Sequence, residues 1–457
     1  MINFLQPHNK RFKVLIVYLL IISQVVTIAG FWLWYHINHP LGNLLTGANF
    51  GRFLAWGRLA GLLAVFCILL QIILVGRVKW VERIFGLDRL TRLHHVIGFS
   101  LVLLLVAHPI LITTGHAMQA GTGFLPQLLD FFRYWKGVLA AAIAMAIMLA
   151  AILFSVAIVL KRLRYEIWYA THLSLYIAIA LAFGHQLAVG SDLTDNRWFA
   201  AYWVALYVFT FGNLMFYRVI RPIRAFVRHR FVVARLVPEA GEATSVYIKG
   251  RNMEAFPIEA GQFMLVRFLA PGFRWEEHPF SMSCRPDGRQ IRLTIKGVGD
   301  FTRRIPELKT GTPVLIDGPH GVFTARRSVS SKTLLIAGGI GITPIRSLAE
   351  ELMAAGREVI LLYANRDRNS LVFGKELDEL ARSSSGRLRL IPVMSDDPAW
   401  PGEKGRIDRN RIARLVPDAR ERDAYLCGPP PMMKSLRSIL AALGVPPARI
   451  YYERFAL

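Results

Sequence analysis

Residues 94–109 read HHVIGFSLVLLLVAHP, an almost entirely apolar stretch that is bracketed by histidines. Ionisable side chains at membrane depth are costly and are usually functional. On an ideal helix His94 and His108, 14 residues apart, point in directions that differ by about 40° and lie roughly 21 Å apart along the axis. The stretch therefore predicts a membrane helix that carries one histidine near each membrane surface.

The composition of the whole chain also indicates a membrane protein. Of the 457 residues, 54% are hydrophobic and only 19% are charged, whereas soluble domains average about 25% charged residues. Residues 1–222 hold 18 Lys and Arg with 6 Asp and Glu, and residues 223–457 hold 37 and 25. The first part is therefore predicted to lie in a membrane and the second to be an ordinary soluble protein.

Six stretches of the first part are long and apolar enough to cross a bilayer, which takes about 20 residues. The first could be a signal sequence, but its apolar run is too long for one, so we expect a retained anchor. The six stretches are Val14–Tyr35, Phe53–Val75, His94–Thr113, Val138–Leu160, Ala170–Val189 and Trp198–Tyr217.

Loop charges predict the orientation of these helices, because Lys and Arg resist translocation. Thirteen Lys and Arg lie at the N-terminus, in the second and fourth connections and at the exit of the last stretch, against five on the other side. Both termini are therefore expected in the cytoplasm, with the chain in the cell (inner) membrane.

A second histidine pair, His172 and His185, lies in the fifth stretch. Their 13-residue separation turns an ideal helix by about 220°, so we expect a bulge or an over-wound turn near Gly184. Two neighbouring helices that carry such pairs could clamp two metal–porphyrin planes, since imidazole is a suitable axial ligand. His95 is the alternative to His94 at the inner position, although its offset to the outer histidine is the poorer geometry.

The three cysteines, Cys67, Cys284 and Cys427, are isolated in the sequence. Their spacing excludes a disulfide framework, a CxxCH haem attachment and a four-cysteine metal site. Redox chemistry in this chain would therefore use other ligands.

The soluble part shows two different patterns. Short alternating strands separated by Gly and Pro predict a small antiparallel barrel, and after residue 331 a strand–turn–helix alternation predicts a parallel α/β sheet. We expect domains at 1–222, 223–328 and 329–457. The predicted strands are Phe231–Val237, Thr244–Lys249, Phe263–Phe268, Ile291–Lys296, Pro313–Asp317, Thr333–Ala337, Val359–Tyr363, Leu388–Val393 and Ala424–Cys427.

Four short motifs lie at strand ends in this soluble part. A glycine turn that opens a helix, GGIGITP at residues 338–344, lets backbone amides approach a phosphate. The other three motifs are HPFS at 278–281, GVGDFT at 297–302 and CGPPPM at 427–432.

Taken together, the motifs and the histidine pairs resemble the ferric reductase and NADPH oxidase superfamily of membrane flavocytochromes b along the whole chain. The soluble part alone resembles ferredoxin-NADP reductase-type dehydrogenases. The resemblance implies FAD, two b-type haems and NAD(P)H, with metal ligands His94, His108, His172 and His185.

The resemblance also implies roles for individual residues. His278, Pro279, Phe280 and Ser281 match the flavin motif, while Gly297, Gly299 and Thr302 match the turn that holds the FAD pyrophosphate. The nicotinamide dinucleotide turn is matched by Gly339, Gly341, Thr343 and Pro344, and the strand end beside the nicotinamide by Cys427, Gly428 and Pro429. Glu453 and Phe455 resemble the terminal acidic and aromatic pair, with Phe455 shielding the flavin; here Ala456 and Leu457 follow it.

The electron acceptor is left open between three classes. We expect a ferric chelate first, oxygen reduced to superoxide second, and a periplasmic protein partner third. Arg58 resembles the arginine that oxidases place beside the outer haem, although a snorkelling arginine would also lie there. A rival interpretation is a flavin reductase, or an interaction subunit, that the helices merely tether.

The donor nucleotide is predicted to be NADPH, with NADH possible. The second predicted sheet strand is followed by Asn365-Arg366-Asp367-Arg368, which offers Arg366 to a 2′-phosphate and lacks the acidic strand end that favours NAD. Membrane lipid is an expected partner of the basic connector near residues 218–230. The sequence contains no EF-hand loop or nucleic-acid-binding motif, so no nucleic-acid partner is expected.

Overall fold

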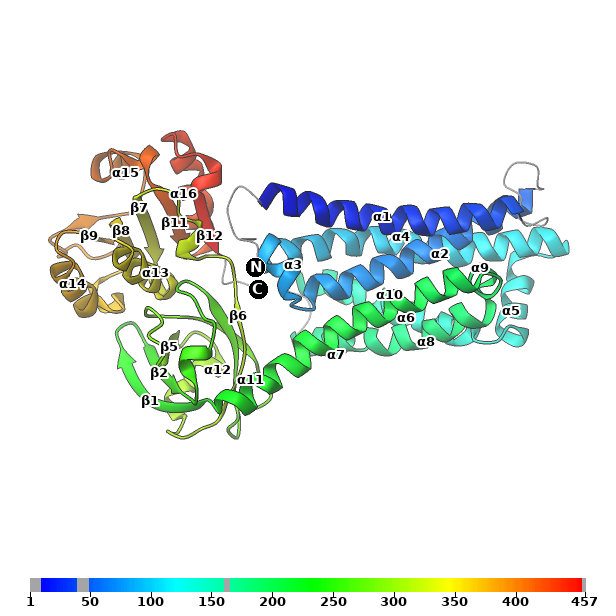
Figure 1. Ribbon diagram of the computed structural model, residues 1–457, viewed down its shortest axis with the longest axis horizontal. Helices are drawn as coiled ribbons and strands as arrows, with labels where there is room; N and C mark the ends of the chain where they lie inside the picture. Colours follow the sequence, from blue (N-terminus) through cyan, green and yellow to red (C-terminus); the bar gives the residue numbers. More distant parts are fainter. Residues whose placement is uncertain (1–9, 39–48, 160–164, 454–457) are drawn as a thin grey trace. The chain divides into compact units, whose positions relative to one another are not determined.

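The structure is a computed structural model that describes residues 10–38, 49–159 and 165–453 (Figure 1). It divides into two compact units. The helical unit comprises Met1–Phe85 and Arg89–Met215, and the sheet unit comprises Gly86–Asp88 and Phe216–Leu457.

Long apolar helices build the helical unit, and among the described residues six of them can cross a membrane by length and composition. This confirms the six predicted stretches. The helices are α1 (Lys10–Asn38), α2 (Asn49–Val75), α3 (Lys79–Phe85), α4 (Leu87–Ala120), α5 (Phe124–Tyr134), α6 (Val138–Val159), α7 (Tyr165–Leu173), α8 (Leu175–Val189), α9 (Ser191–Thr194) and α10 (Arg197–Met215).

The expected irregularity near Gly184 is wrong, because that residue lies inside the regular helix α8. The irregularity lies at Ser174, between α7 and α8. The hydroxyl of Ser174 donates to the carbonyl of Thr171 at 2.6 Å, and such local side-chain bonds compete with helical backbone bonds. The break falls two residues after His172 and changes the rotation between this residue and His185.

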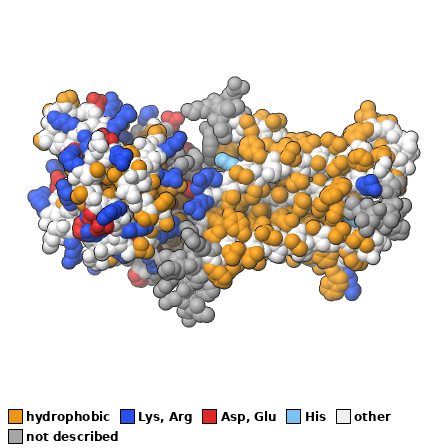
Figure 2. All heavy atoms as spheres, turned by 90° about the horizontal axis from the view of Figure 1, so that it is seen from above, with side chains coloured by type: hydrophobic (Ala, Val, Ile, Leu, Met, Phe, Trp, Pro, Cys, Tyr) orange, Lys and Arg blue, Asp and Glu red, His pale blue; other side chains and the backbone are white. Residues whose placement is uncertain are grey.

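Hydrophobic side chains dominate the face of the helical unit that Figure 2 shows. Exposed Leu, Val, Ile and Phe side chains recur along its helices, as expected where lipid rather than water surrounds them. The interior is packed by large side chains such as Trp203 and Phe199, which are almost fully buried beside Ile28 of α1. Apolar side chains therefore make up both this packed cluster and most of the surface shown.

The sheet unit begins with a π-helical turn (Phe216–Ile220) and α11 (Arg221–His229). Two three-stranded antiparallel sheets follow, in the orders β1-β2-β5 and β4-β3-β6. Their strands are β1 (Val232–Glu239), β2 (Ala243–Lys249), β3 (Phe263–Phe268), β4 (His278–Ser281), β5 (Ile291–Lys296) and β6 (Val314–His320), and α12 (Asp300–Arg303) follows β5.

The predicted antiparallel barrel is corrected by the structure. The ladders of these two sheets do not join, so no closed barrel forms. Their edges meet only at isolated bridges between Val232 and Pro313 and between Met282 and Leu293. Around the first bridge, the backbone N–H groups of Val233 and Val314 donate to Thr312 and Phe231, each at 2.9 Å, but the pairing does not continue as a ladder. The two sheets instead enclose a shared hydrophobic core that includes Val246.

A six-stranded parallel sheet, in the order β10-β9-β8-β7-β11-β12, completes the sheet unit. The predicted α/β sheet is thereby confirmed, with β10 and β12 as additional strands. The elements are β7 (Lys332–Gly338), α13 (Ile342–Ala354), β8 (Glu358–Asn365), α14 (Gly374–Ser383), β9 (Leu388–Met394), β10 (Glu403–Lys404), α15 (Arg409–Leu415), β11 (Asp423–Cys427), α16 (Pro430–Ala442) and β12 (Ile450–Glu453).

Candidate functional site

The four histidines that were predicted as metal ligands form two pairs in the helical unit. The ring centres of His94 in α4 and His172 in α7 are 6.1 Å apart, and those of His108 in α4 and His185 in α8 are 6.4 Å apart. His95 is a neighbour of His94, with ring centres 6.1 Å apart. The structure thus brings the predicted ligands together as one pair towards each end of α4.

Helix α2 orients the ring of His108. The Nδ1–H group of His108 donates to the carbonyl oxygen of Gly57 at 2.8 Å, because a carbonyl can only accept, and this leaves Nε2 as the nitrogen with a lone pair. A Cβ atom on Gly61 would lie only 2.6 Å from His108 Nδ1. A glycine at position 61 is therefore what allows the ring to lie against α2.

The other three imidazoles have a different environment. Among the residues that the structure describes, the buried Nδ1 atoms of His94, His172 and His185 have no hydrogen-bond partner. Gln71 donates to the backbone carbonyl of His94 at 2.9 Å rather than to its ring. Unpaired buried polar atoms are rare in native proteins, and a bound ion or cofactor is one explanation for them.

Arg58 of α2 lies beside the carboxylate of Asp192 and the ring of Tyr35. Its Nη1 atom is 3.9 Å from Asp192 Oδ2, and its guanidinium lies 5.2 Å from the ring centre of Tyr35. His36 also approaches Asp192, with Nε2 and Oδ1 3.8 Å apart. Sequence reasoning missed Asp192, since no local motif relates residue 192 to residue 58.

The HPFS motif forms β4, which pairs only with β3 and is an edge strand of its sheet. This position tolerates Pro279, because an edge strand leaves one row of backbone N–H groups unpaired. Ser281 is buried and lies opposite Phe263, whereas Phe280 is partly exposed. The ring of His278 packs against Phe301 with ring centres 4.0 Å apart.

The second predicted flavin motif is a tight turn before α12. The hydroxyl oxygen of Thr302 accepts from the backbone N–H groups of Val298 and Gly299, at 3.0 and 2.9 Å. Gly297 precedes this turn at the end of β5, and Val298 is exposed. The Thr302 side chain therefore closes the turn, and the turn lies at the surface.

The nucleotide motifs converge at the carboxyl ends of β7 and β11. Gly339 adopts a φ of +53°, which favours glycine, and a Cβ on Gly341 would lie 2.5 Å from the carbonyl oxygen of Cys427. Thr343 and Pro344 form the first turn of α13, where proline is tolerated. Open α/β sheets bind ligands outside these carboxyl strand ends.

Cys427 and Glu453 are adjacent partners on β11 and β12. Cys427 is fully buried; burial, and then the charge of Glu453, raise the pKa of its thiol well above the usual range. Gly428 and Pro429 follow and lead into α16. Phe455 lies outside the described residues.

Two aspartates that are distant in the sequence lie beside the arginines that follow β8. Arg366 is exposed and its Nε is 3.4 Å from Asp396 Oδ2, and Arg368 binds both oxygens of Asp397 at 2.8 and 3.0 Å. Hydrogen bonding from Arg368 lowers the pKa of Asp397. The two aspartates follow β9, 30 residues away from the arginines, so the sequence pattern did not reveal them.

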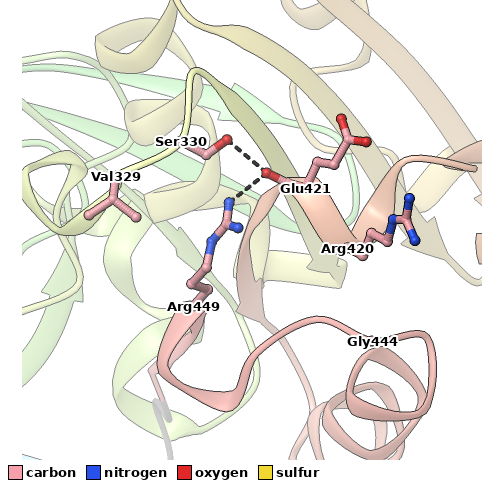
Figure 3. A pocket seen from close by; sticks show the side chains of 6 residues that line it. All are labelled: Val329, Ser330, Arg420, Glu421, Gly444 and Arg449. Carbon is pink, nitrogen blue, oxygen red and sulfur yellow. Dashed lines mark hydrogen bonds between the residues drawn. The ribbon is translucent and has the colours of Figure 1, made fainter.

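A cavity of about 550 Å³ lies on the side of the parallel sheet opposite to the carboxyl ends of its strands (Figure 3). Ser330, Glu421 and Arg449 precede β7, β11 and β12, so the cavity is at the amino ends of these strands. Glu421 contributes its backbone carbonyl, which accepts from the Ser330 hydroxyl at 2.8 Å and from Arg449 at 2.5 Å. This cavity is remote from the predicted nucleotide motifs within the sheet.

Comparisons with known families divide the chain in the same order as its motifs. The family "Ferric reductase like transmembrane component" matches residues 60–183, "FAD-binding domain" matches 228–324 and "Oxidoreductase NAD-binding domain" matches 335–438. Residues 94, 108 and 172 fall within the first match.

Individual relatives resemble about half of the chain. A flavohemoprotein of Candida albicans is 30% identical over 234 residues, which is 49% of this chain and 58% of that protein. The ferredoxin reductase component of 3-ketosteroid-9-alpha-monooxygenase from Mycobacterium tuberculosis is 35% identical over 239 residues, 49% of this chain and 64% of that protein. Each match thus spans less than two thirds of the relative.

A similar solved structure is the FAD/NAD-binding domain of nitric oxide dioxygenase from Vibrio cholerae. It is 26% identical, has a TM-score of 0.44, and the match covers 49% of this chain and 98% of that one.

Proposed function

We propose that the chain moves electrons across the membrane as a multi-pass, flavin-dependent NAD(P)H oxidoreductase of the ferric reductase and NADPH oxidase type. The three family matches support this proposal. The proposed path runs from cytoplasmic NAD(P)H through FAD and two b-type haems to a ferric chelate on the outer side. FAD, when bound, accepts a hydride and releases single electrons, and the protein supplies binding and orientation.

The distances within the histidine pairs are the observation that carries this proposal. A metal–nitrogen bond of roughly 2 Å on each side of one metal atom separates two imidazole ring centres by about 6 Å. The measured separations are 6.1 and 6.4 Å. Haem iron held by two such ligands would supply one-electron redox chemistry.

The hydrogen bond of the His108 ring supports the same assignment. The bond from His108 Nδ1 to Gly57 fixes the tautomer whose Nε2 can bind a metal, and metal-bound histidines usually have such a partner. We assign His94 rather than His95 to the other pair, because the His94 ring is the one that faces His172 at the ligand separation.

Orientation follows from the distribution of positive charge. We place the protein in the cell (inner) membrane with both termini in the cytoplasm. In this orientation His94 and His172 lie nearer the cytoplasmic side, and His108 and His185 lie nearer the outer side. Protease accessibility of tags placed at each terminus in sealed vesicles tests this orientation. Cleavage of terminal tags from the outer side would contradict it.

We propose the domain boundaries 1–222, 223–328 and 329–457, of which the last two form the soluble part. His278–Ser281 and the turn at 297–302 would bind FAD, whereas the glycine turn at 339–344 and Cys427–Pro429 would bind the nucleotide. The close approach of Gly341 to Cys427 supports the second set, since both segments meet at the same strand ends.

Ferric chelate is our leading acceptor, and oxygen is the second candidate because of Arg58. The nearby Asp192 carboxylate balances much of the positive charge that an arginine would offer to superoxide. Vesicle assays that compare iron reduction with and without superoxide dismutase distinguish the two. Iron reduction that the dismutase abolishes would establish superoxide as the product and overturn our ordering; a protein partner would require its own docking assay.

NADPH is the proposed donor, with NADH as the alternative. Arg366 and Arg368 can meet a 2′-phosphate, but Asp396 and Asp397 oppose it. Replacing Asp397 with Ser should therefore increase the NADPH-to-NADH ratio of kcat/KM by roughly ten-fold, the effect of removing about 1.4 kcal/mol of repulsion. An unchanged ratio would show that the aspartate does not face the phosphate.

A single spectrum tests the central proposal. The purified protein should show a b-type Soret band, and His108→Ala should lose transmembrane reduction while cytoplasmic flavin reduction continues. A spectrum of flavin alone would instead support the rival in which the helices only tether a flavin reductase. Full transmembrane activity in His108→Ala would likewise refute the haem path.

A further inference from the structure

Arg292 of β5 is a nearly fully buried arginine, with 4% of its surface exposed. Its guanidinium grips Glu376 of α14 through two hydrogen bonds of 2.7 and 2.8 Å. Its Nη2 atom also donates to Glu239 of β1 at 2.6 Å. The contact with Glu376 joins the antiparallel sheets to the parallel-sheet domain.

A second arginine approaches the same carboxylate from α13. Arg346 Nη1 lies 2.8 Å from Glu376 Oε2. The ring centre of Phe373 lies close to both guanidiniums, 4.6 Å from that of Arg292 and 4.7 Å from that of Arg346. Hydrogen bonding from Arg292 lowers the pKa of Glu376, so this carboxylate is ionised at neutral pH.

Phe373 adopts a φ of +62°. A bulky side chain in the left-handed region is a genuine outlier, and such strain persists where surrounding contacts over-determine it. Here the strained turn places the ring beside both arginines. It also starts α14, which carries Glu376 in its first turn. The local strain thus serves the junction between the two domains.

Helix α13 has a separate attachment to the segment that follows β4. Ser347 donates to the carbonyl of Cys284 at 2.8 Å. The backbone N–H of Arg285 donates to Glu350 at 2.5 Å, and its side chain binds Glu351 at 2.8 Å. The HPFS strand and α13 are therefore connected only a few residues beyond the motif.

Helix α13 begins at the Gly339–Gly341 turn, and both attachments hold it against the antiparallel sheets. We propose that Glu376, with Arg292 and Arg346, is a positioning device that sets the nucleotide turn relative to the flavin motif. The inference uses the NAD(P)H oxidoreductase activity and is independent of the haems and of the acceptor. None of the three residues needs to touch a substrate.

This role separates hydride transfer from nucleotide affinity. Affinity depends on groups at the strand ends of the parallel sheet, whereas transfer depends on the register between two domains. A misplacement of about 1 Å can reduce a reaction rate by up to 10²-fold. Glu376→Gln replaces one carboxylate oxygen with an N–H group that faces an arginine, so the junction should loosen without a change in side-chain volume.

Glu403→Gln is the matched control. Glu403 also binds two arginines, Arg411 at 3.1 Å and Arg414 at 2.7 Å, but all three residues belong to the parallel-sheet domain. The two variants therefore remove the same charge from equivalent two-arginine environments. Of these two glutamates, Glu376 is the one that connects the parallel-sheet domain to the antiparallel sheets.

The experiment uses the full-length protein and follows flavin reduction by NADPH and by NADH in an anaerobic stopped-flow instrument. We expect Glu376→Gln to reduce the rate of flavin reduction about ten-fold and to weaken the nicotinamide–flavin charge-transfer band. Nucleotide Kd, FAD content and the oxidation of reduced flavin by ferricyanide should stay within two-fold of the wild type. Hydrogen exchange should become faster at residues 282–286 in this variant alone.

Equal rates of flavin reduction in the wild type and Glu376→Gln would overturn the proposal, as would an equal decrease in Glu403→Gln. If Glu376→Gln fails to retain FAD, Arg346→Lys becomes the deciding variant, because it keeps the charge but loses the planar fork. Unchanged flavin reduction in Arg346→Lys, with unchanged exchange at 282–286, would then refute the positioning role. Iron reduction across the membrane by a protein that lacks haem would instead contradict the proposed electron path, whatever the rate of flavin reduction.

Discussion

Gly61 offers a sharp test of the outer histidine pair. A Cβ added at Gly61 would lie 2.6 Å from Nδ1 and 2.8 Å from Cε1 of His108. Comfortable contacts between such atoms begin near 3.5 Å, so Gly61→Ala should displace the ring by roughly 0.9 Å. The displacement would also disturb the 2.8 Å bond between His108 and Gly57.

Loss of the partner that orients a metal-bound histidine typically costs 10–100-fold in metal affinity. We therefore expect Gly61→Ala to retain the inner haem and to lose most of the outer one. The assay is the ratio of haem to FAD in the purified protein, which should fall from about two towards one. Reduced-minus-oxidised spectra should lose one component at the same time.

Gly184→Ala is the matched control for this test. Gly184 precedes His185 in α8, and nothing lies within 4 Å of a Cβ built there. Alanine is favoured over glycine within helices by about 1 kcal/mol, so this variant should retain both haems and be at least as stable. Two haems per FAD and an unchanged spectrum in Gly61→Ala would refute the ligand assignment of His108.

Three further predictions concern the sheet unit. Gly341→Ala should weaken NAD(P)H binding at least ten-fold with unchanged FAD content, because its Cβ would lie 2.5 Å from the Cys427 carbonyl; normal nucleotide titration of this variant would contradict the turn assignment. Cys284 should react slowly with iodoacetamide at pH 8, since burial raises the pKa of its thiol to about 11 and leaves about one thiol in a thousand ionised; mass spectrometry of native protein should show rapid labelling only after denaturation. Glu376 has a lowered pKa in the folded protein, so its stabilising contribution is present above its usual pKa and is lost as pH falls through the lowered value; thermal unfolding of Glu376→Gln should consequently depend less on pH in that acidic range, and parallel profiles would contradict it.

Sequence patterns predicted most of the elements because their signals are local. Apolar length predicts a membrane helix whichever neighbours it has, and the boundaries of β3 and β5 follow from alternation alone. The failures have a common cause. Whether two sheets join into one barrel depends on pairing between distant strands, which here is limited to isolated bridges. The helix break lies at Ser174 rather than near Gly184.

The candidate site divides in the same way. The motifs at 278–281, 297–302, 339–344 and 427–429 could be read from consecutive residues. The ion-pair partners of two arginines outside these motifs could not be read in this way. Asp192 near Arg58 and Asp397 on Arg368 come from other elements. Long-range pairs carry no signal in a single sequence, because side-chain contacts across a fold have no fixed separation along the chain.

Hydropathy and local patterns were enough to predict that the chain combines apolar membrane helices with an antiparallel part and a parallel-sheet part. They also showed which histidines lie in those helices. These properties depend on hydropathy, periodicity and short turns, which act over a few residues. The folded arrangement was needed to show that the His94 ring lies beside His172 and that Glu376 joins two domains through Arg292. Those outcomes depend on helix rotation and on the packing of distant strands, where a shift of about 1 Å or one residue changes which groups meet.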